Sequence, residues 1–149
     1  MKKLFAVILT LFILIFCGAA ADAAPQISAH SAILIDAETG RVMFSKSSDE
    51  RLAMASTTKI MTAVTALESD GFDIDRTIEI SENAAGVEGS SMYLQKGEKI
   101  SMRNLLYGLM LSSGNDAAVA IAEAVSGDET AFVELMNKKV GEIGAADTH

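Results

Sequence analysis

Ser56 and Lys59 are the two residues whose types and spacing point most directly to chemistry. They stand three positions apart in the run Ser-Thr-Thr-Lys, at the start of a segment with helical periodicity. That spacing puts both side chains on one helix face, with Cβ atoms about 5–6 Å apart. A serine hydroxyl needs a neighbouring base to become a strong nucleophile, and a neutral lysine amine can be that base. The pair therefore predicts a serine nucleophile that works without histidine.

A second motif, Ser113-Gly114-Asn115, follows downstream. Its serine could relay a proton and its asparagine could hold an amide substrate, while the glycine permits a sharp turn that aims both into a cleft. Taken singly, each motif also has an ordinary structural explanation, as a solvated helix turn or a capped helix boundary. Together, and in this order, they predict a serine acyl-enzyme site.

The elements that must position these motifs are predicted from periodicity and capping residues. Residues 32–36 and 41–45 are β-like and flank a turn, so we expect a hairpin. Residues 56–67 have helical spacing. Three later helices are expected: one capped by Ser101, one over 116–125 capped by Asn115 and ended by Gly127, and one opened by Asp128. A hairpin followed by a mostly helical section indicates an α+β fold.

Two apolar stripes are expected to face the core of these later helices. The stripe of the first comprises Met102, Leu105, Leu106, Leu109 and Met110. The stripe of the last comprises Phe132, Leu135, Met136, Val140 and Ile143.

Residues 1–23 are predicted to be a secretory signal peptide. Two lysines precede an apolar run over 4–16, and the small residues Ala21 and Ala23 favour cleavage before Ala24. An uncleaved anchor helix is the alternative, but the run is short for a membrane span. Cys17, the chain's only cysteine, would leave with the signal, so the exported protein would have no disulfide. We therefore expect a periplasmic protein, or one on the outer face of the membrane or cell wall.

Composition and histidine placement exclude several other functions. The formal net charge of −8 argues against non-specific binding of nucleic acid. His30 and His149 have no partner pattern, so neither a metal site nor a Ser-His-Asp triad is supported. No cofactor is expected.

The two motifs and their surroundings resemble the serine D-Ala-D-Ala carboxypeptidases, which are the low-molecular-mass penicillin-binding proteins of peptidase family S11. Residues 55–62 look like the nucleophile helix of that family, residues 104–118 resemble its second motif region, and residues 33–40 are similar to its first hairpin. The resemblance extends from about residue 30 to the end of the chain. It implies an incomplete β-lactamase/transpeptidase-like fold, with residues 24–149 as the N-terminal part of the catalytic domain.

The resemblance also implies residue roles. Ser56 would attack the carbonyl between the two terminal D-alanines of a peptidoglycan stem peptide, and Lys59 would accept its proton. Ser113 would relay a proton to the leaving amine, and Asn115 would bind the substrate backbone and help to orient Lys59. β-Lactams would acylate the same serine and so act as inhibitors.

The chain departs from the family in one respect, because it contains no Lys-Thr-Gly motif. In the family that motif lies on a later strand and completes the oxyanion hole. The later sheet strands and the usual C-terminal tail, through which a family member could associate with a membrane, are missing too. We therefore expect a truncated, N-terminal fragment that is inactive alone, so that the 149-residue chain would not be acylated by a fluorescent penicillin.

Three alternatives remain open. A class A-like β-lactamase usually has Asp where this chain has Gly114, and a D,D-endopeptidase would use the same motifs as the carboxypeptidase. The third is a non-catalytic, penicillin-binding remnant, which a stop codon directly after His149 in the genomic DNA would support.

Overall fold

The computed structural model describes residues 25–145 and 147–149. The chain divides into two compact units, residues 1–50 and residues 51–149. The predicted signal peptide, residues 1–23 with Cys17, lies outside the described residues.

The described part of the first unit contains the predicted hairpin. Strand β1 (Ala32–Ile35) pairs antiparallel with strand β2 (Val42–Lys46), in a register that sets Ala32 opposite Lys46. The Asp36 carboxylate closes the connection by accepting hydrogen bonds from the Thr39 backbone N–H at 2.8 Å and from its hydroxyl at 2.6 Å. The hairpin expected from two β-like runs that flank a turn is thus present.

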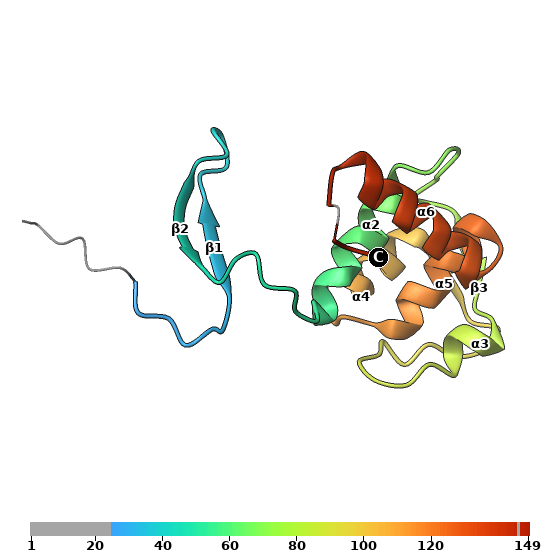
Figure 1. The fold of residues 1–149 in the computed structure, drawn as a ribbon. Coiled ribbons are helices and arrows are strands. Elements are labelled where there is room, and N and C mark those ends of the chain that lie inside the picture. Colours follow the sequence, from blue (N-terminus) through green and yellow to red (C-terminus); the bar gives the residue numbers. More distant parts are fainter. Residues whose placement is uncertain (1–24, 146) are drawn as a thin grey trace, which may run out of the picture. The chain divides into compact units, whose positions relative to one another are not determined.

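The second unit contains the remaining elements, most of which are labelled in Figure 1. In chain order these are η1 (Ala55–Thr57), α2 (Thr58–Leu67), β3 (Thr77–Glu79), α3 (Glu82–Ala85), β4 (Lys99–Ser101), α4 (Met102–Leu111), α5 (Asn115–Ser126) and α6 (Glu129–Glu142). Helix α5 contacts α2, α3, α4 and α6 and is therefore the centre of this unit. Strands β3 and β4 form a separate antiparallel pair.

Most of the predicted helix ends are confirmed. The Ser101 hydroxyl accepts from the Asn104 N–H at the start of α4, and the Asp128 carboxylate accepts from the Ala131 N–H at the start of α6. Gly127 ends α5 with a φ of +88°. The prediction that Asn115 caps α5 is wrong, because Asn115 is the first residue of the helix and Gly114 holds the cap position without a side-chain hydrogen bond.

The core of the second unit is made chiefly by the apolar faces of α2, α4, α5 and α6. Met102, Leu105 and Leu109 of α4 are almost fully buried, whereas Met110 is 51% exposed. Burial follows the i, i+3, i+7 positions, and Met110 lies one position beyond that line. The predicted stripe was therefore too wide.

The predicted stripe of α6 was also too wide. Phe132 and Val140 are buried, but Leu135 is 39% and Ile143 61% exposed. Ile143 is the C-cap residue that follows the last residue of the helix.

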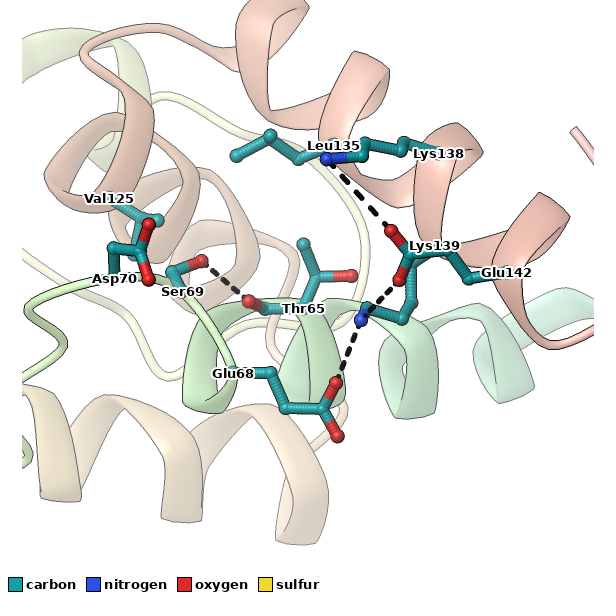
Figure 2. Close-up of a pocket in the computed structure, with 9 residues that line it drawn as sticks. All are labelled: Thr65, Glu68, Ser69, Asp70, Val125, Leu135, Lys138, Lys139 and Glu142. Atoms are coloured by element: carbon teal, nitrogen blue, oxygen red, sulfur yellow. Dashed lines mark hydrogen bonds and ion pairs between the residues drawn. The ribbon is translucent and has the colours of Figure 1, made fainter.

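Lys139 ties α6 to the C-terminal end of α2. Its ammonium lies 2.9 Å from the Glu68 carboxylate and 2.7 Å from that of Glu142 (Figure 2). Hydrogen bonds to Glu142 and then to Glu68 raise the pKa of Lys139 to about 12. These groups line a hollow of about 440 Å³ between the two helices, which also includes Thr65 and Leu135.

Within the described residues, no helix combines the length and the apolar character needed to cross a membrane.

Candidate active site

Ser56 lies in a tight turn that leads into α2. The structure forms a 3₁₀ turn, η1, over Ala55–Thr57, and the α-helix begins at Thr58, so the predicted helix 56–67 starts as 3₁₀. The Thr57 hydroxyl holds this turn by donating to the Met54 carbonyl at 2.6 Å. Ser56 is exposed, so its hydroxyl is open to a substrate.

Lys59 stands in the first turn of α2 and is only 8% exposed. Its amine donates to the Asn115 Oδ1 at 2.7 Å. A buried amine that lacked such an acceptor would be costly to bury. The Asn115 amide therefore both satisfies the lysine and fixes where its nitrogen lies.

Ser113 meets Ser56 directly, because its hydroxyl donates to the Ser56 Oγ at 2.7 Å. The backbone near both serines is unusual: Ser113 has a φ of +54°, and Ala55, which precedes Ser56, has a φ of +46°. Left-handed conformations are uncommon for residues with a Cβ, and such strain clusters at functional sites. Two strained positions thus present the two hydroxyls to each other.

The four residues predicted to form the site come together, but as two pairs. The hydroxyls of Ser56 and Ser113 form one pair, and the amine of Lys59 and the amide of Asn115 form the other. Within the described residues, Ser56 and Lys59 share no hydrogen bond with each other. Each pair instead joins the start of α2 to the segment that enters α5.

The orientation of the Asn115 amide is set by a loop. Its Nδ2 donates to the Glu88 carbonyl at 2.8 Å, and its backbone N–H donates to the Ser90 carbonyl at 2.7 Å. With Nδ2 committed to Glu88, the Oδ1 must face Lys59. Gly89 allows this approach, because its φ is +97° and an added Cβ would lie 2.6 Å from the Asn115 Nδ2.

Asp116 is a residue of this region for which the sequence indicated only a helix-start charge. It is 1% exposed, and its carboxylate accepts hydrogen bonds from the Ser91 hydroxyl at 2.6 Å and from the backbone N–H groups of Met92 and Leu94, each at 3.0 Å. The N–H of Ala117 is a further donor, at 2.8 Å.

Burial by itself raises the pKa of the Asp116 carboxyl. The hydrogen bonds from the Ser91 hydroxyl and from the three backbone N–H groups outweigh that effect, so the net pKa lies below its usual value. Asp116 is thus held as a buried carboxylate. The signal in the sequence was an acidic residue in an otherwise apolar helix segment.

Among the described residues, no cluster of three or more His, Cys, Asp or Glu side chains could hold a metal ion. The hollow between α2 and α6 contains none of the four predicted site residues.

Comparison with known proteins places this chain in a family. A family model described as D-alanyl-D-alanine carboxypeptidase, peptidase S11, matches residues 18–149. The chain belongs to this family. Among curated proteins it is 45% identical over 123 residues to the D-alanyl-D-alanine carboxypeptidase DacF of Bacillus subtilis, covering 80% of this chain and 32% of that protein. It is 38% identical over 134 residues to DacA of Escherichia coli, covering 84% and 33%.

Solved structures of the family have the same fold. The D-alanyl-D-alanine carboxypeptidase DacD of Francisella tularensis matches with a TM-score of 0.79 and 42% identity, over 85% of this chain and 32% of that one. The Streptomyces K15 DD-transpeptidase matches with a TM-score of 0.80 and 32% identity, over 85% and 52%. The predicted α+β fold, as a part of the β-lactamase/transpeptidase-like fold, is confirmed. The chain spans about a third of the length of its curated relatives.

Proposed function

We propose that the full-length protein, meaning this chain together with the sequence that completes its catalytic domain, is a serine-type D-Ala-D-Ala carboxypeptidase. It removes the terminal D-alanine from peptidoglycan stem peptides. The observation that carries the proposal is the convergence of Ser56 with Ser113, and of Lys59 with Asn115, at 2.7 Å each. Membership of the carboxypeptidase family supports the choice of substrate.

In the proposed reaction, the Ser56 Oγ attacks the carbonyl carbon of the last peptide bond. The proton of Ser56 passes to the amine of Lys59, which must be unprotonated to accept it, and the tetrahedral intermediate carries the negative charge on its oxygen. The backbone N–H of Ser56, at the start of α2, supplies one donor to that oxyanion. A donor from the Lys-Thr-Gly strand, outside this chain, supplies the other.

Collapse of the intermediate breaks the C–N bond and releases D-alanine. The leaving nitrogen takes a proton through the hydroxyl of Ser113, which already touches the Ser56 Oγ. Water then attacks the Ser56 ester and liberates the shortened peptide. The Asn115 Oδ1 accepts from Lys59 and its Nδ2 donates one hydrogen to the Glu88 carbonyl. The second Nδ2 hydrogen is left to bind the substrate backbone. A β-lactam would acylate Ser56 by the same attack, so we propose that β-lactams inhibit the enzyme.

Gly114 favours the carboxypeptidase over a class A-like β-lactamase. An added Cβ would lie 2.8 Å from the Asp116 Oδ1 and 3.2 Å from the Met92 Cγ. The aspartate that β-lactamases carry at this position would therefore not fit without a shift of the buried carboxylate. A D,D-endopeptidase activity on cross-linked stem peptides uses the same groups and is the second candidate.

We further propose that residues 1–23 export the protein and that it acts outside the cytoplasmic membrane. The proposed peptidoglycan substrate supports this location. The two lysines and the apolar run at the N-terminus support export by a signal peptide. We also propose that membrane association, where it occurs, is made through the C-terminal tail that is usual in the family.

The test is release of D-alanine from a synthetic stem pentapeptide ending in D-Ala-D-Ala. We expect the full-length protein to release one D-alanine per peptide and the Ser56→Ala variant to release none above background. A cross-linked dimer of stem peptides, assayed in parallel, measures the endopeptidase. The absence of D-alanine release by the folded wild type would refute the carboxypeptidase proposal.

A further inference from the structure

Asp116 has more hydrogen bonds than capping a helix requires. Three of its four donors, the Ser91 hydroxyl and the backbone N–H groups of Met92 and Leu94, come from a single loop. This loop, residues 88–94, follows α3 and lies outside the regular elements. One buried carboxylate at the start of α5 therefore anchors the loop.

The same loop holds Asn115. The carbonyls of Glu88 and Ser90 accept from the side-chain and backbone nitrogens of Asn115 at 2.8 and 2.7 Å. Asn115 in turn accepts from the Lys59 amine at 2.7 Å. The Asp116 carboxylate is thus connected to the predicted base through its hydrogen bonds to the loop, the loop backbone, and the hydrogen bonds of Asn115 to the loop and to Lys59.

Two glycines show how closely the loop packs against its neighbours. The Met92 side chain packs against Gly108 of α4 so tightly that a Cβ on this glycine would overlap its thioether. Gly89 of the loop lies so close to the Asn115 amide that a Cβ at this position would be 2.6 Å from the Asn115 Nδ2. Loss of the Asp116 bonds would remove the three hydrogen bonds that hold Ser91, Met92 and Leu94 of the loop to the start of α5.

We propose that Asp116 is a positioning residue of the active site, which acts by fixing the 88–94 loop so that the loop carbonyls hold the Asn115 amide against Lys59. The inference rests on the proposed function, because it assigns Asp116 a part in the acylation of Ser56. Asp116 itself touches neither Ser56 nor Lys59 and transfers no proton.

The variant that tests this is Asp116→Asn in the full-length protein. It keeps the shape of the side chain but replaces one acceptor oxygen by an NH₂ group that faces N–H donors. We expect the second-order rate constant for acylation by a fluorescent penicillin to fall about 10- to 100-fold, the size of effect that a small misplacement of catalytic groups produces. In the D-alanine assay, kcat should fall more than KM changes.

A double-mutant cycle separates positioning from a general loss of structure. In an Asn115→Ala background, adding Asp116→Asn should change the acylation rate less than about threefold, because the group through which Asp116 acts is already gone. Asp128→Asn is the matched control. Asp128 is also a helix-start carboxylate that accepts from a backbone N–H, and this variant should keep the wild-type rate.

Ser91→Ala is the milder variant, for use if Asp116→Asn does not fold, since it removes one donor to the carboxylate. We expect it to acylate several-fold more slowly than the wild type. A wild-type rate in the folded Asp116→Asn protein, or in Ser91→Ala when the former does not fold, overturns the proposal. An undiminished effect in the Asn115→Ala background overturns it as well. Failure of the wild type itself to be acylated contradicts the proposed function, and the inference falls with it.

Discussion

Gly114 is the position at which one added methyl group gives the sharpest test of the site's packing. Its φ of −60° and ψ of 118° suit any residue, so replacement by alanine brings no backbone strain. The new Cβ would nevertheless lie 2.8 Å from the Asp116 Oδ1, 3.2 Å from the Met92 Cγ and 3.3 Å from the Ala117 Cβ. The nearest of these atoms belongs to a carboxylate held by four hydrogen-bonding groups, so it cannot move aside freely.

The expected cost of Gly114→Ala follows from these contacts. Forcing a methyl group into a packed site costs about 1–3 kcal/mol, and the lower entropy of the unfolded alanine variant offsets roughly 0.4–1 kcal/mol of this. We expect a net destabilisation of about 1–2 kcal/mol. Gly141→Ala is the matched control, because Gly141 is in helix α6 with nothing within 4 Å of its added Cβ. This control should be neutral or stabilising, by up to about 1 kcal/mol.

The assay is urea denaturation of the two full-length variants beside the wild type, followed by far-UV circular dichroism. The penicillin acylation rate is measured on the same samples. Gly114→Ala should lower both the free energy of unfolding and the acylation rate, whereas Gly141→Ala should lower neither. If the two alanine variants were equally stable, the close contact between Gly114 and Asp116 would be refuted.

Three further predictions concern the core, the relay and pH. Leu105→Ala, at a fully buried position, should lower the free energy of unfolding by about 2–5 kcal/mol. Leu111→Ala, at a position that is 82% exposed, should change that free energy by less than about 0.5 kcal/mol in the same urea titration. Ser113→Ala removes the hydroxyl that contacts Ser56 and should slow D-alanine release about 10²-fold or more at unchanged stability; an unaltered kcat would exclude the relay. The pKa of Asp116 is held below its ordinary value of 3.8, so its contribution to stability is complete above that pH and is lost as the pH falls through the lower, folded-state value. The stability difference between wild type and Asp116→Asn should therefore be larger at pH 7 than below pH 3.8. A difference that grew on acidification would contradict the assignment.

The hairpin and the helices could be predicted from the sequence because local signals specify them. Two β-like runs and the turn between them predicted β1 and β2, and capping residues such as Ser101 and Asp128 predicted where α4 and α6 begin. The width of the buried faces could not be predicted. Burial of Met110 or Leu135 depends on which neighbouring helix lies opposite, and periodicity does not specify that.

The site was partly predictable for a similar reason. Spacing and resemblance selected Ser56, Lys59, Ser113 and Asn115, and the structure brings them together in pairs. Their roles stay predictions until they are tested in the enzyme. Asn115 was expected to cap a helix, a common local use of asparagine, but its amide is committed instead to Lys59 and to the Glu88 carbonyl.

The supporting contacts were not predictable from residue types. The acceptors for Asn115 are backbone carbonyls, which every residue has, so nothing in the sequence marks Glu88 or Ser90. The importance of Asp116 likewise depends on a loop more than 20 positions earlier folding back onto it. Such long-range contacts appear only when the chain is folded.

The most direct test of the central claim, that Ser56 is the acylated nucleophile, is mass spectrometry of the full-length protein after reaction with benzylpenicillin. We expect the intact mass to rise by one penicilloyl group, and peptide mapping to place that group on the peptide containing Ser56. The Ser56→Ala variant should remain unmodified. An adduct on any other residue, or an adduct that persists in Ser56→Ala, would contradict the account.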